Sequence, residues 1–389
     1  MDPCTRISVE QTGEPSVRKG LRVIVLLPDP AGPHSGRGDE NFDYAGAGDC
    51  DRMLLDSVVR AGFEVGVRYV HLDNIDAVVE ALVCDAVLNL CDGSGREKDG
   101  MPGLEALDAL ERRGLPYTGS RASAYAIGSD KVAMKERFAA WGVPTPAWQL
   151  VSSSEDELAP ALLAALPLIV KPRDGGGSAG IRLASVVHDE RELRERIGEV
   201  CATYGQALVE QYIDGREITV GVLDTRRGPR VLPPLEVRFG ESFPADRKIR
   251  TFDTKWDVSS PLYHDFELLC PAPMSLALRR RVQQVARAAY AAIDGSGYGR
   301  VDMRLDESGP YVLEVNPNCS LEWSDEDVGG CAMLPTAARA AGIDYPALLR
   351  ELLGGAFRMR RKQRANERAL AIAAAPSTEG RVARRRSRG

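Results

Sequence analysis

The sequence predicts an α/β protein of several lobes, in which a parallel α/β layer comes first and antiparallel strands follow. The chain has 389 residues, enough for two or three domains of about 150 residues each. Over the first 120 or so residues, apolar strand-like runs alternate with short helical patterns, which is typical of a parallel sheet. After Pro144 the strand-like runs follow one another more directly, as they do in hairpins.

The first lobe is predicted over residues 21–120, after a disordered N-terminus at 1–20. The run LRVIVLLP (Leu21–Pro28) is continuously apolar and ends at a proline, as a buried strand does. Further strands are FEVGVRYV and AVLNLC, with a helix near Asp73–Val83 between them. The glycine-rich loop DGSGREKDGMPG (Asp92–Gly103) and the segment LPYTGS close the lobe.

The rest of the chain is predicted to form a central lobe, a C-terminal lobe and a basic flexible tail, over residues 121–208, 209–355 and 356–389. Asp130 can cap a helix that runs through Trp141. A long helix is expected over Cys270–Ile293, with prolines near its start and Asp-Gly at its end. Strands are expected at Leu166–Pro172, Ala207–Ile213, Glu217–Asp224 and Arg230–Phe239.

Composition excludes several classes of protein. The chain is 44% hydrophobic and 27% charged, as ordinary soluble globular proteins are. No apolar run approaches the ~18 residues of a membrane span, and the N-terminus lacks the apolar centre of a secretory signal. Eight cysteines without a CxxC pair, and only four histidines, argue against a disulfide framework or a zinc site. We therefore expect a protein of the reducing cytoplasm.

The net charge of −6 conceals an asymmetry. Residues 358–389 hold eleven Lys and Arg against two acidic residues, so the rest of the chain is strongly acidic. An acidic body does not suggest a nucleic-acid enzyme. The basic tail could touch nucleic acid or an anionic surface, but blocks of like charge are most often disordered, and we expect a flexible appendage.

The segment RVDMRLDESGPYVLEVN predicts a hairpin with polar side chains on one face. If Glu307–Gly309 is a three-residue loop, Asp306 pairs with Pro310, and two acidic residues further along lie directly opposite each other. Side chains two residues apart share a face of a strand. The residues on this face are Arg300, Asp302, Glu314 and Asn316.

Two chemical interpretations of this face remain open. Opposed carboxylates repel each other, and a cation between them removes the repulsion. Two carboxylates and an amide oxygen, without sulfur or imidazole, suit Mg²⁺ or Mn²⁺ that keeps water and substrate phosphates as its other ligands. The alternative is a solvated strand face on which Arg300 neutralises the acids.

A glycine-rich loop follows the predicted strand LPLIVKP. Glycines let the backbone approach a ligand closely and turn its N–H groups towards phosphate oxygens. Lys171 stands at the strand end, where its ammonium can reach the same phosphates, and Gly175–Gly180 follow. The pattern is neither GxxxxGK(S/T) nor GxGxxG after the first strand, so P-loop and Rossmann sites are excluded. Taken alone, such a loop is more often a mobile turn.

Together these segments resemble the ATP-grasp superfamily, and most closely the D-alanine–D-alanine ligases. The resemblance spans about Asn89–Pro346. It rests on the order and spacing of YTGS, DK, VKP with the glycine loop, VEQYIDGRE, TKW, CPAP, RVD, LEVNPN and LPTAARAAGIDYP. It implies an ATP-grasp fold of three lobes, with ATP between the last two, an antiparallel sheet in the C-terminal lobe and a mobile loop around Lys255.

The resemblance also implies roles at the matching positions. Those that hold ATP are Lys131 and Lys171 at the phosphates, Gly176, Gly177 and Ser178 in the lid, Glu210 to Ile213 at the adenine, and Glu217 at the ribose. Those at the reaction centre are Lys255 at the phosphate, Arg300 at the tetrahedral intermediate, and Asp302, Glu314 and Asn316 as magnesium ligands.

The implied reaction activates a carboxylate with the γ-phosphate of ATP, which yields an acyl phosphate and ADP. An amine then attacks and phosphate leaves. Positioning and neutralisation of developing charge suffice for this chemistry, so no cysteine or histidine needs a catalytic role. The expected cofactors are ATP and Mg²⁺ (or Mn²⁺), the expected substrates are small amino acids or amines, and the resemblance is compatible with a homodimer.

The substrate half departs from the family pattern. Asp92 stands where the family has a histidine, Gly177 replaces the first serine of the glycine loop, Trp256 replaces a tyrosine, and Ala332 aligns with a substrate-binding serine. The loop after the first strand also lacks the family's pattern. A polar substrate site that loses such groups usually changes its specificity.

The loop after Asn316 is longer than in the family and strongly acidic. Acids expected near the amine acceptor are Asp92, Glu322, Asp325, Glu326 and Asp327. They favour a cationic or larger acceptor, although a merely solvated loop would look the same. We therefore expect a specialised amide ligase, for example in natural-product biosynthesis. The alternatives are a true D-alanine–D-alanine ligase of cell-wall synthesis and a non-catalytic ATP-binding regulator.

Overall fold

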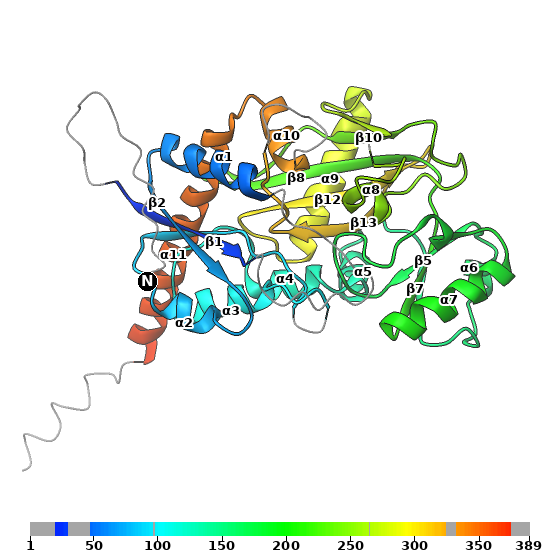
Figure 1. Cartoon of the computed structure of the whole chain (residues 1–389), viewed down its shortest axis with the longest axis horizontal. Helices are drawn as coiled ribbons and strands as arrows, with labels where there is room; N and C mark the ends of the chain where they lie inside the picture. The colour runs from blue at the N-terminus through cyan, green and yellow to red at the C-terminus, as the bar shows by residue number, and fades with distance from the viewer. Residues whose placement is uncertain (1–19, 30–46, 96–97, 264, 324–331, 375–389) are drawn as a thin grey trace, which may run out of the picture.

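The structure is a computed structural model that describes residues 20–29, 47–95, 98–263, 265–323 and 332–374. Residues 1–19 of the predicted disordered N-terminus, and the end of the basic tail from residue 375, lie outside the described residues. The chain forms three sheets. Figure 1 shows the first and second at opposite ends of the long axis, with the third between them.

The first lobe is the expected parallel α/β layer. Its sheet has the order β2-β1-β3, and both neighbours run parallel to the central strand. The strands are β1 (Arg22–Pro28), β2 (Glu64–Val70) and β3 (Ala86–Asn89). The helices are α1 (Ala47–Arg60), α2 (Ile75–Glu80) and α3 (Leu104–Arg113). Alternate residues of β1 pack into different apolar clusters on the two faces of the sheet, so the continuous apolar run is explained by burial on both sides.

The second lobe is an antiparallel sheet of order β4-β7-β5-β6. Its strands are β4 (Trp148–Val151), β5 (Leu168–Pro172), β6 (Val186–Val187) and β7 (Ala207–Gln211). The helices α6 (Pro160–Leu163) and α7 (Glu190–Tyr204) supply the rest of its apolar core. The boundary predicted between residues 208 and 209 falls inside β7, because this strand pairs with both β4 and β5.

The third sheet has six strands and positions most of the polar residues singled out in the sequence. Its order is β11-β10-β8-β12-β13, and β9 pairs with β8. The strands are β8 (Arg216–Thr225), β9 (Gly228–Val231), β10 (Leu235–Phe239), β11 (Phe266–Leu269), β12 (Tyr298–Leu305) and β13 (Pro310–Pro317). Helix α9 (Leu276–Ala292) covers one face, where it packs on Val301 and Val315. The polar side chains of β12 and β13 lie on the other face.

Four further helices lie between or after these strands. They are α4 (Ala122–Gly128), α5 (Lys131–Ala140), α8 (Asp253–Trp256) and α10 (Met333–Ala340). Asp130 caps α5 as predicted, because its carboxylate accepts hydrogen bonds from the backbone N–H groups of Val132 and Ala133. Although α5 was expected in the central lobe, its Met134 and Phe138 join the apolar core under the third sheet.

The hairpin of β12 and β13 has the predicted register where the polar face lies. Arg300 pairs with Asn316, and Asp302 with Glu314. The predicted turn is one residue too short, because Leu305 pairs with Pro310 and four residues lie between them. An irregularity after Asp302 shifts the register by one residue. It thus offsets the longer turn and leaves the two carboxylates opposite each other.

Two predicted elements are wrong in extent, and prolines explain both. The strand expected over Arg230–Phe239 is split into β9 and β10, because Pro233 and Pro234 cannot donate to a strand ladder. The helix expected from Cys270 begins only at Leu276, after Ser275 as its cap. Ahead of that cap lie two prolines, which restrict the residues before them to extended backbone.

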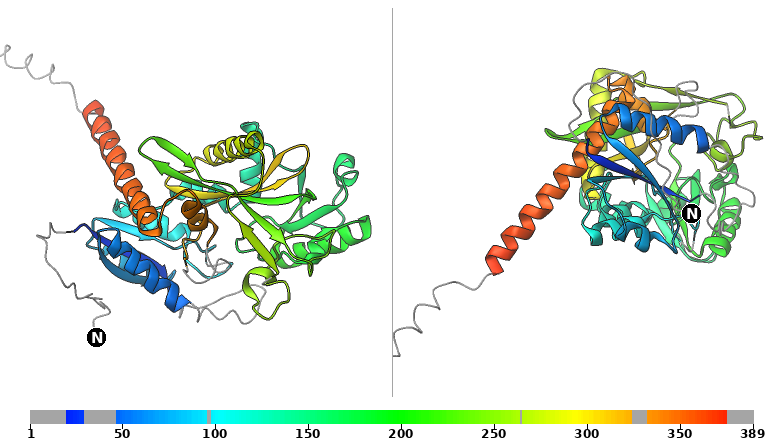
Figure 2. Two further views of the ribbon diagram at one scale, coloured as in Figure 1. Left: turned by 90° about the horizontal axis from the view of Figure 1, so that it is seen from above. Right: turned by 60° about the vertical axis from the view of Figure 1, so that its left-hand side comes forward.

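The final helix, α11 (Tyr345–Ala374), corrects the prediction of a flexible tail from residue 356. Its apolar residues recur at helical spacing and pack with α1 and β3 of the first lobe, and also with β8 and α10. Beyond that contact, Figure 2 shows its end projecting away from the body of the chain. Within the described ranges, no helix is both long and apolar enough to cross a membrane.

The packing of α11 makes a prediction about stability. Leu348 is 0% exposed, whereas Leu276 on α9 is 61% exposed. We expect Leu348→Ala to lower the free energy of unfolding by about 2–5 kcal/mol, because it leaves a cavity between α11 and the first lobe. The matched Leu276→Ala should change it by less than about 0.5 kcal/mol. Urea denaturation measures both, and equal effects would contradict the packing described.

Candidate active site

The carboxylate of Asp302 lies at the centre of a hydrogen-bonded group on the polar face of the third sheet. The Arg300 guanidinium donates to it from Nε at 3.0 and 3.1 Å and from Nη2 at 3.0 Å. Thr219 on β8 donates from Oγ1 at 2.8 Å, and Asn316 from Nδ2 at 2.9 Å. The alternating pattern of the hairpin brings three of these side chains to one face, and the pairing of β8 with β12 adds Thr219.

Glu314, directly opposite Asp302, sits among four cations. Burial alone would raise the pKa of this carboxyl, but Lys131, Lys171, Lys255 and Arg300 hold it at about 2. These cations come from α5, β5, α8 and β12, which the folded chain brings together from distant parts of the sequence. Such a surplus of positive charge around one carboxylate suits a polyanionic ligand.

A second buried carboxylate, Glu210 on β7, orders two lysines on the opposite wall. Its oxygens lie 3.1 Å from Nζ of Lys135 and 2.7 Å from Nζ of Lys171, and its side chain is inaccessible to solvent. Burial would raise the pKa of Glu210, yet the two lysines lower it. The family resemblance implies that Glu210 meets adenine. In the structure its carboxylate forms ion pairs with the two lysines instead. Its backbone groups take no part in these ion pairs.

Three hydrogen bonds hold the glycine loop against neighbouring segments. Lys131 donates from Nζ to the Gly175 carbonyl at 3.0 Å, and Ser178 donates from Oγ to the carbonyl of Arg250 at 2.9 Å. The Trp256 indole donates to the Gly177 carbonyl at 2.8 Å. Gly177 and Trp256, two of the departures from the family pattern, therefore contact each other. The loop lies against α8 rather than apart from it.

The residues expected at the nucleoside lie on β8 and just after β7. Glu217 on β8 forms an ion pair of 3.0 Å with Arg304, whose guanidinium also donates to the Gly215 carbonyl. Ile213 is buried just after β7. The arrangement thus brings the predicted nucleoside, phosphate and hairpin residues to the second and third sheets. No nucleotide is needed to explain the Glu217 to Arg304 contact, and its role at the ribose stays a prediction.

The donor set of the hairpin fits a hard divalent cation. Asp302, Glu314 and Asn316 supply two carboxylates and an amide, which leave other positions to water and phosphate. Asn316 turns Nδ2 towards both carboxylates, at 2.9 and 3.3 Å. To bind a cation, Asn316 would have to turn its amide oxygen to this side in place of Nδ2. The amide has nearly the same shape in both orientations. The contact of Arg300 with Asp302 also matches the alternative interpretation, in which Arg300 neutralises the acids.

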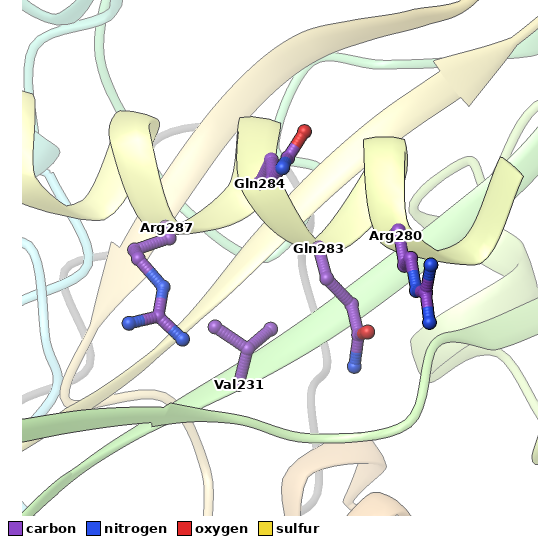
Figure 3. A pocket seen from close by; sticks show the side chains of 5 residues that line it. All are labelled: Val231, Arg280, Gln283, Gln284 and Arg287. Atoms are coloured by element: carbon purple, nitrogen blue, oxygen red, sulfur yellow. The ribbon is translucent and has the colours of Figure 1, made fainter. Parts of the chain in front are cut away.

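The open pockets of the outer surface are different in character from this site. Figure 3 shows one formed by α9 and Val231 of β9, with Arg280, Gln283, Gln284 and Arg287 around it. It lies on the α9 side of the third sheet, whereas Arg300 and Asp302 point to the other side. Its lining has neither a carboxylate nor a nucleophile, so it lacks the groups that would hold a metal ion or attack a substrate.

Sequence reasoning missed three residues of the site. Lys135 lies one helical turn after Lys131, and this spacing could have revealed it, because residues four apart share a face of a helix. Thr219 could have been found only from the pairing of β8 with β12. Arg250 belongs to none of the recognised motifs. Of the predicted acidic loop, Asp325, Glu326 and Asp327 lie outside the described residues.

The sequence profile of the family described as D-ala D-ala ligase C-terminus matches residues 138–354. The chain belongs to this family. The D-alanine–D-alanine ligase of Bordetella pertussis is 35% identical over 251 residues, which are 64% of this chain and 72% of the relative. That of Bacillus anthracis is 30% identical over 292 residues, 75% of this chain and 86% of the relative.

One similar protein carries no activity in its name. It is an uncharacterized protein of Sinorhizobium fredii, 34% identical over 256 residues, 64% of this chain and 68% of the relative. A solved structure of the Bacillus anthracis ligase complexed with ATP shares the fold, with a TM-score of 0.65 at 24% identity. The match covers 88% of this chain and 99% of that one. The ATP-grasp fold and an ADP-forming ligase are thereby confirmed, and the alternative of a non-catalytic regulator is set aside.

The electrostatics of Lys255 predict a pH dependence of nucleotide binding. Burial, and next the charges of Arg250 and Arg300, lower the pKa of this lysine to about 8, against the opposite effect of Glu314 and Asp302. The ammonium is therefore charged below pH 8 and neutral above it. We expect affinity for a non-hydrolysable ATP analogue to fall up to ~tenfold per pH unit above 8.

Lys255→Arg, which stays charged, should reduce this dependence. Isothermal titration calorimetry between pH 7 and pH 9.5 measures it. An affinity that stays constant over this range in the wild-type protein would contradict the position of Lys255 among the cations.

Proposed function

We propose that the protein is a D-alanine–D-alanine ligase, which joins two D-alanine molecules at the expense of ATP. The observation that carries the proposal is the gathering of four cations around Glu314, beside the carboxylate of Asp302. This charge pattern suits a polyphosphate with its metal. The relatives in Bordetella pertussis and Bacillus anthracis, both named for this activity, support the same choice of substrate.

The residues divide into four groups by what they would do. Lys131 and Lys171 hold the phosphates of ATP, and the backbone of Gly176 and Gly177 with Ser178 covers them. Lys255 neutralises the phosphoryl group as it moves to the substrate carboxylate, since charge develops on its oxygens in that step. Residues of the chain would thus bind and orient ATP and the substrate and exclude water.

Arg300 would stabilise the tetrahedral intermediate that forms when the amine attacks the acyl phosphate. Its guanidinium donates from Nε to Oδ1 and from Nη2 to Oδ2 of Asp302 in the structure, so the oxyanion competes with this carboxylate for the same donors. Asp302, Glu314 and Asn316 would hold Mg²⁺, which supplies further neutralisation of phosphate charge when bound. Because ATP is available there, the cytoplasm is the proposed location. A homodimer stays a prediction.

One observation favours a second kind of acceptor, one with a cationic side chain. Asp92 stands in the substrate loop, and its carboxyl faces Glu322 and Asp99. Asp92 is exposed to solvent, yet desolvation first and these two carboxylates next raise its pKa to about 7. A cationic side chain on the acceptor would relieve this repulsion. The named relatives support D-alanine rather than the specialised substrate expected from the sequence.

The two acceptors can be separated by phosphate release from Mg·ATP. We expect turnover with D-alanine alone, because the cation cluster and hairpin are those of a carboxylate-activating site. D-ornithine and D-lysine, offered together with D-alanine, provide the cationic acceptors, and the L-amino acids provide the stereochemical control. Mass spectrometry of the product identifies which amine was joined.

Turnover only with a cationic acceptor would contradict the proposal and favour the second one. In that case Asp92→Asn should raise KM for the cationic acceptor about tenfold, the loss of one charged contact, with little change in KM for ATP. No phosphate release with any amino acid, despite bound ATP, would contradict both.

A further inference from the structure

Arg250 is a cation of the site that has no role in the family motifs or in the proposed mechanism. It is half-buried in the segment between β10 and α8, and its Nε atom is buried without a hydrogen-bond partner. Among the described residues, no carboxylate lies within ion-pair distance of its guanidinium. A desolvated and unpaired guanidinium is costly, and proteins usually pair or hydrogen-bond such groups.

The position of Arg250 is fixed from two sides. Its guanidinium lies over the ring of Phe266 on β11, with 4.4 Å from Cζ to the ring centroid. Its backbone carbonyl accepts the hydrogen bond from Ser178 of the glycine loop at 2.9 Å. Stacking against an aromatic face leaves the N–H groups at the guanidinium edge free to donate in the plane. The arginine is therefore held in place while its Nε atom has no hydrogen-bond partner.

Charged groups of both the nucleoside region and the hairpin lie near Arg250. Burial lowers its pKa most, Arg300 lowers it as well, and Glu217 and Asp302 act in the opposite sense. Arg250 also lowers the pKa of Lys255. It thus lies near both Glu217, proposed at the ribose, and Asp302, proposed at the metal. The phosphates of a bound nucleotide have to cross this interval.

We propose that Arg250 is a further ATP-binding residue, which donates hydrogen bonds to the β- and γ-phosphates of the nucleotide. A planar guanidinium suits phosphate oxygens, which can accept two of its N–H groups at once. The inference rests on the proposed function for the identity of the nucleotide. It adds that the segment before α8 contributes a phosphate contact besides Lys255, and that its link to Ser178 couples this contact to the glycine loop.

Nucleotide binding to Arg250→Gln tests the inference without catalysis. We expect the variant to bind a non-hydrolysable ATP analogue and ADP, each with Mg²⁺, at least tenfold more weakly in calorimetry. Adenosine, followed by displacement of a fluorescent nucleoside, should bind within twofold of the wild-type protein. Arg250→Lys keeps a charge but not the planar fork, so it should lose less affinity than Arg250→Gln.

Arg247→Gln is the matched control. Arg247 is also half-buried and lies three residues earlier, but it contacts Glu192 and Asp246 at 3.6 Å outside the site. Its replacement should leave all three affinities unchanged. Equal binding of the ATP analogue by Arg250→Gln and wild type would overturn the inference, as would an equal loss for adenosine. Failure of the wild-type protein to bind ATP would overturn the proposed function itself.

Discussion

The site depends on one electrostatic constraint, the gathering of more positive than negative charge around two opposed carboxylates. Asp302 and Glu314 face each other across β12 and β13, and four cations hold the pKa of Glu314 at about 2. A protein interior does not favour such an excess of charge unless a ligand completes it. The surrounding fold can be understood as the means of bringing these cations together, because α5, β5, α8 and β12 each contribute one.

Two sets of contacts hold these cations in place. Glu210 holds Lys135 and Lys171 at one wall, so Lys171 is anchored by a carboxylate that is itself inaccessible to water. On the other side the glycine loop meets the segment around α8 through Ser178 and Trp256. The Trp256 contact uses the backbone carbonyl of Gly177. This contact therefore requires no side chain at position 177.

Most of the correct predictions came from local patterns of residues in the sequence. The alternation of side chains in a hairpin placed Arg300, Asp302, Glu314 and Asn316 on one face, and the structure has this arrangement because an irregularity offsets the longer turn. The prolines at 233 and 234, by contrast, were visible in the sequence and should have divided the predicted strand. The apolar spacing of α11 was likewise visible, but its packing partners and the positions of Thr219 and Arg250 depend on contacts between distant segments, for which a single sequence contains no signal.

Binding of Mn²⁺ tests the central claim most directly, because electron paramagnetic resonance reports the metal without requiring turnover. The account predicts weak binding to the free protein, since the cations repel the metal, and tight binding once a non-hydrolysable ATP analogue is present. Glu314→Gln should abolish the tight binding, whereas Glu267→Gln, on the exposed part of β11, should leave it intact. Tight Mn²⁺ binding that survives Glu314→Gln would contradict the account.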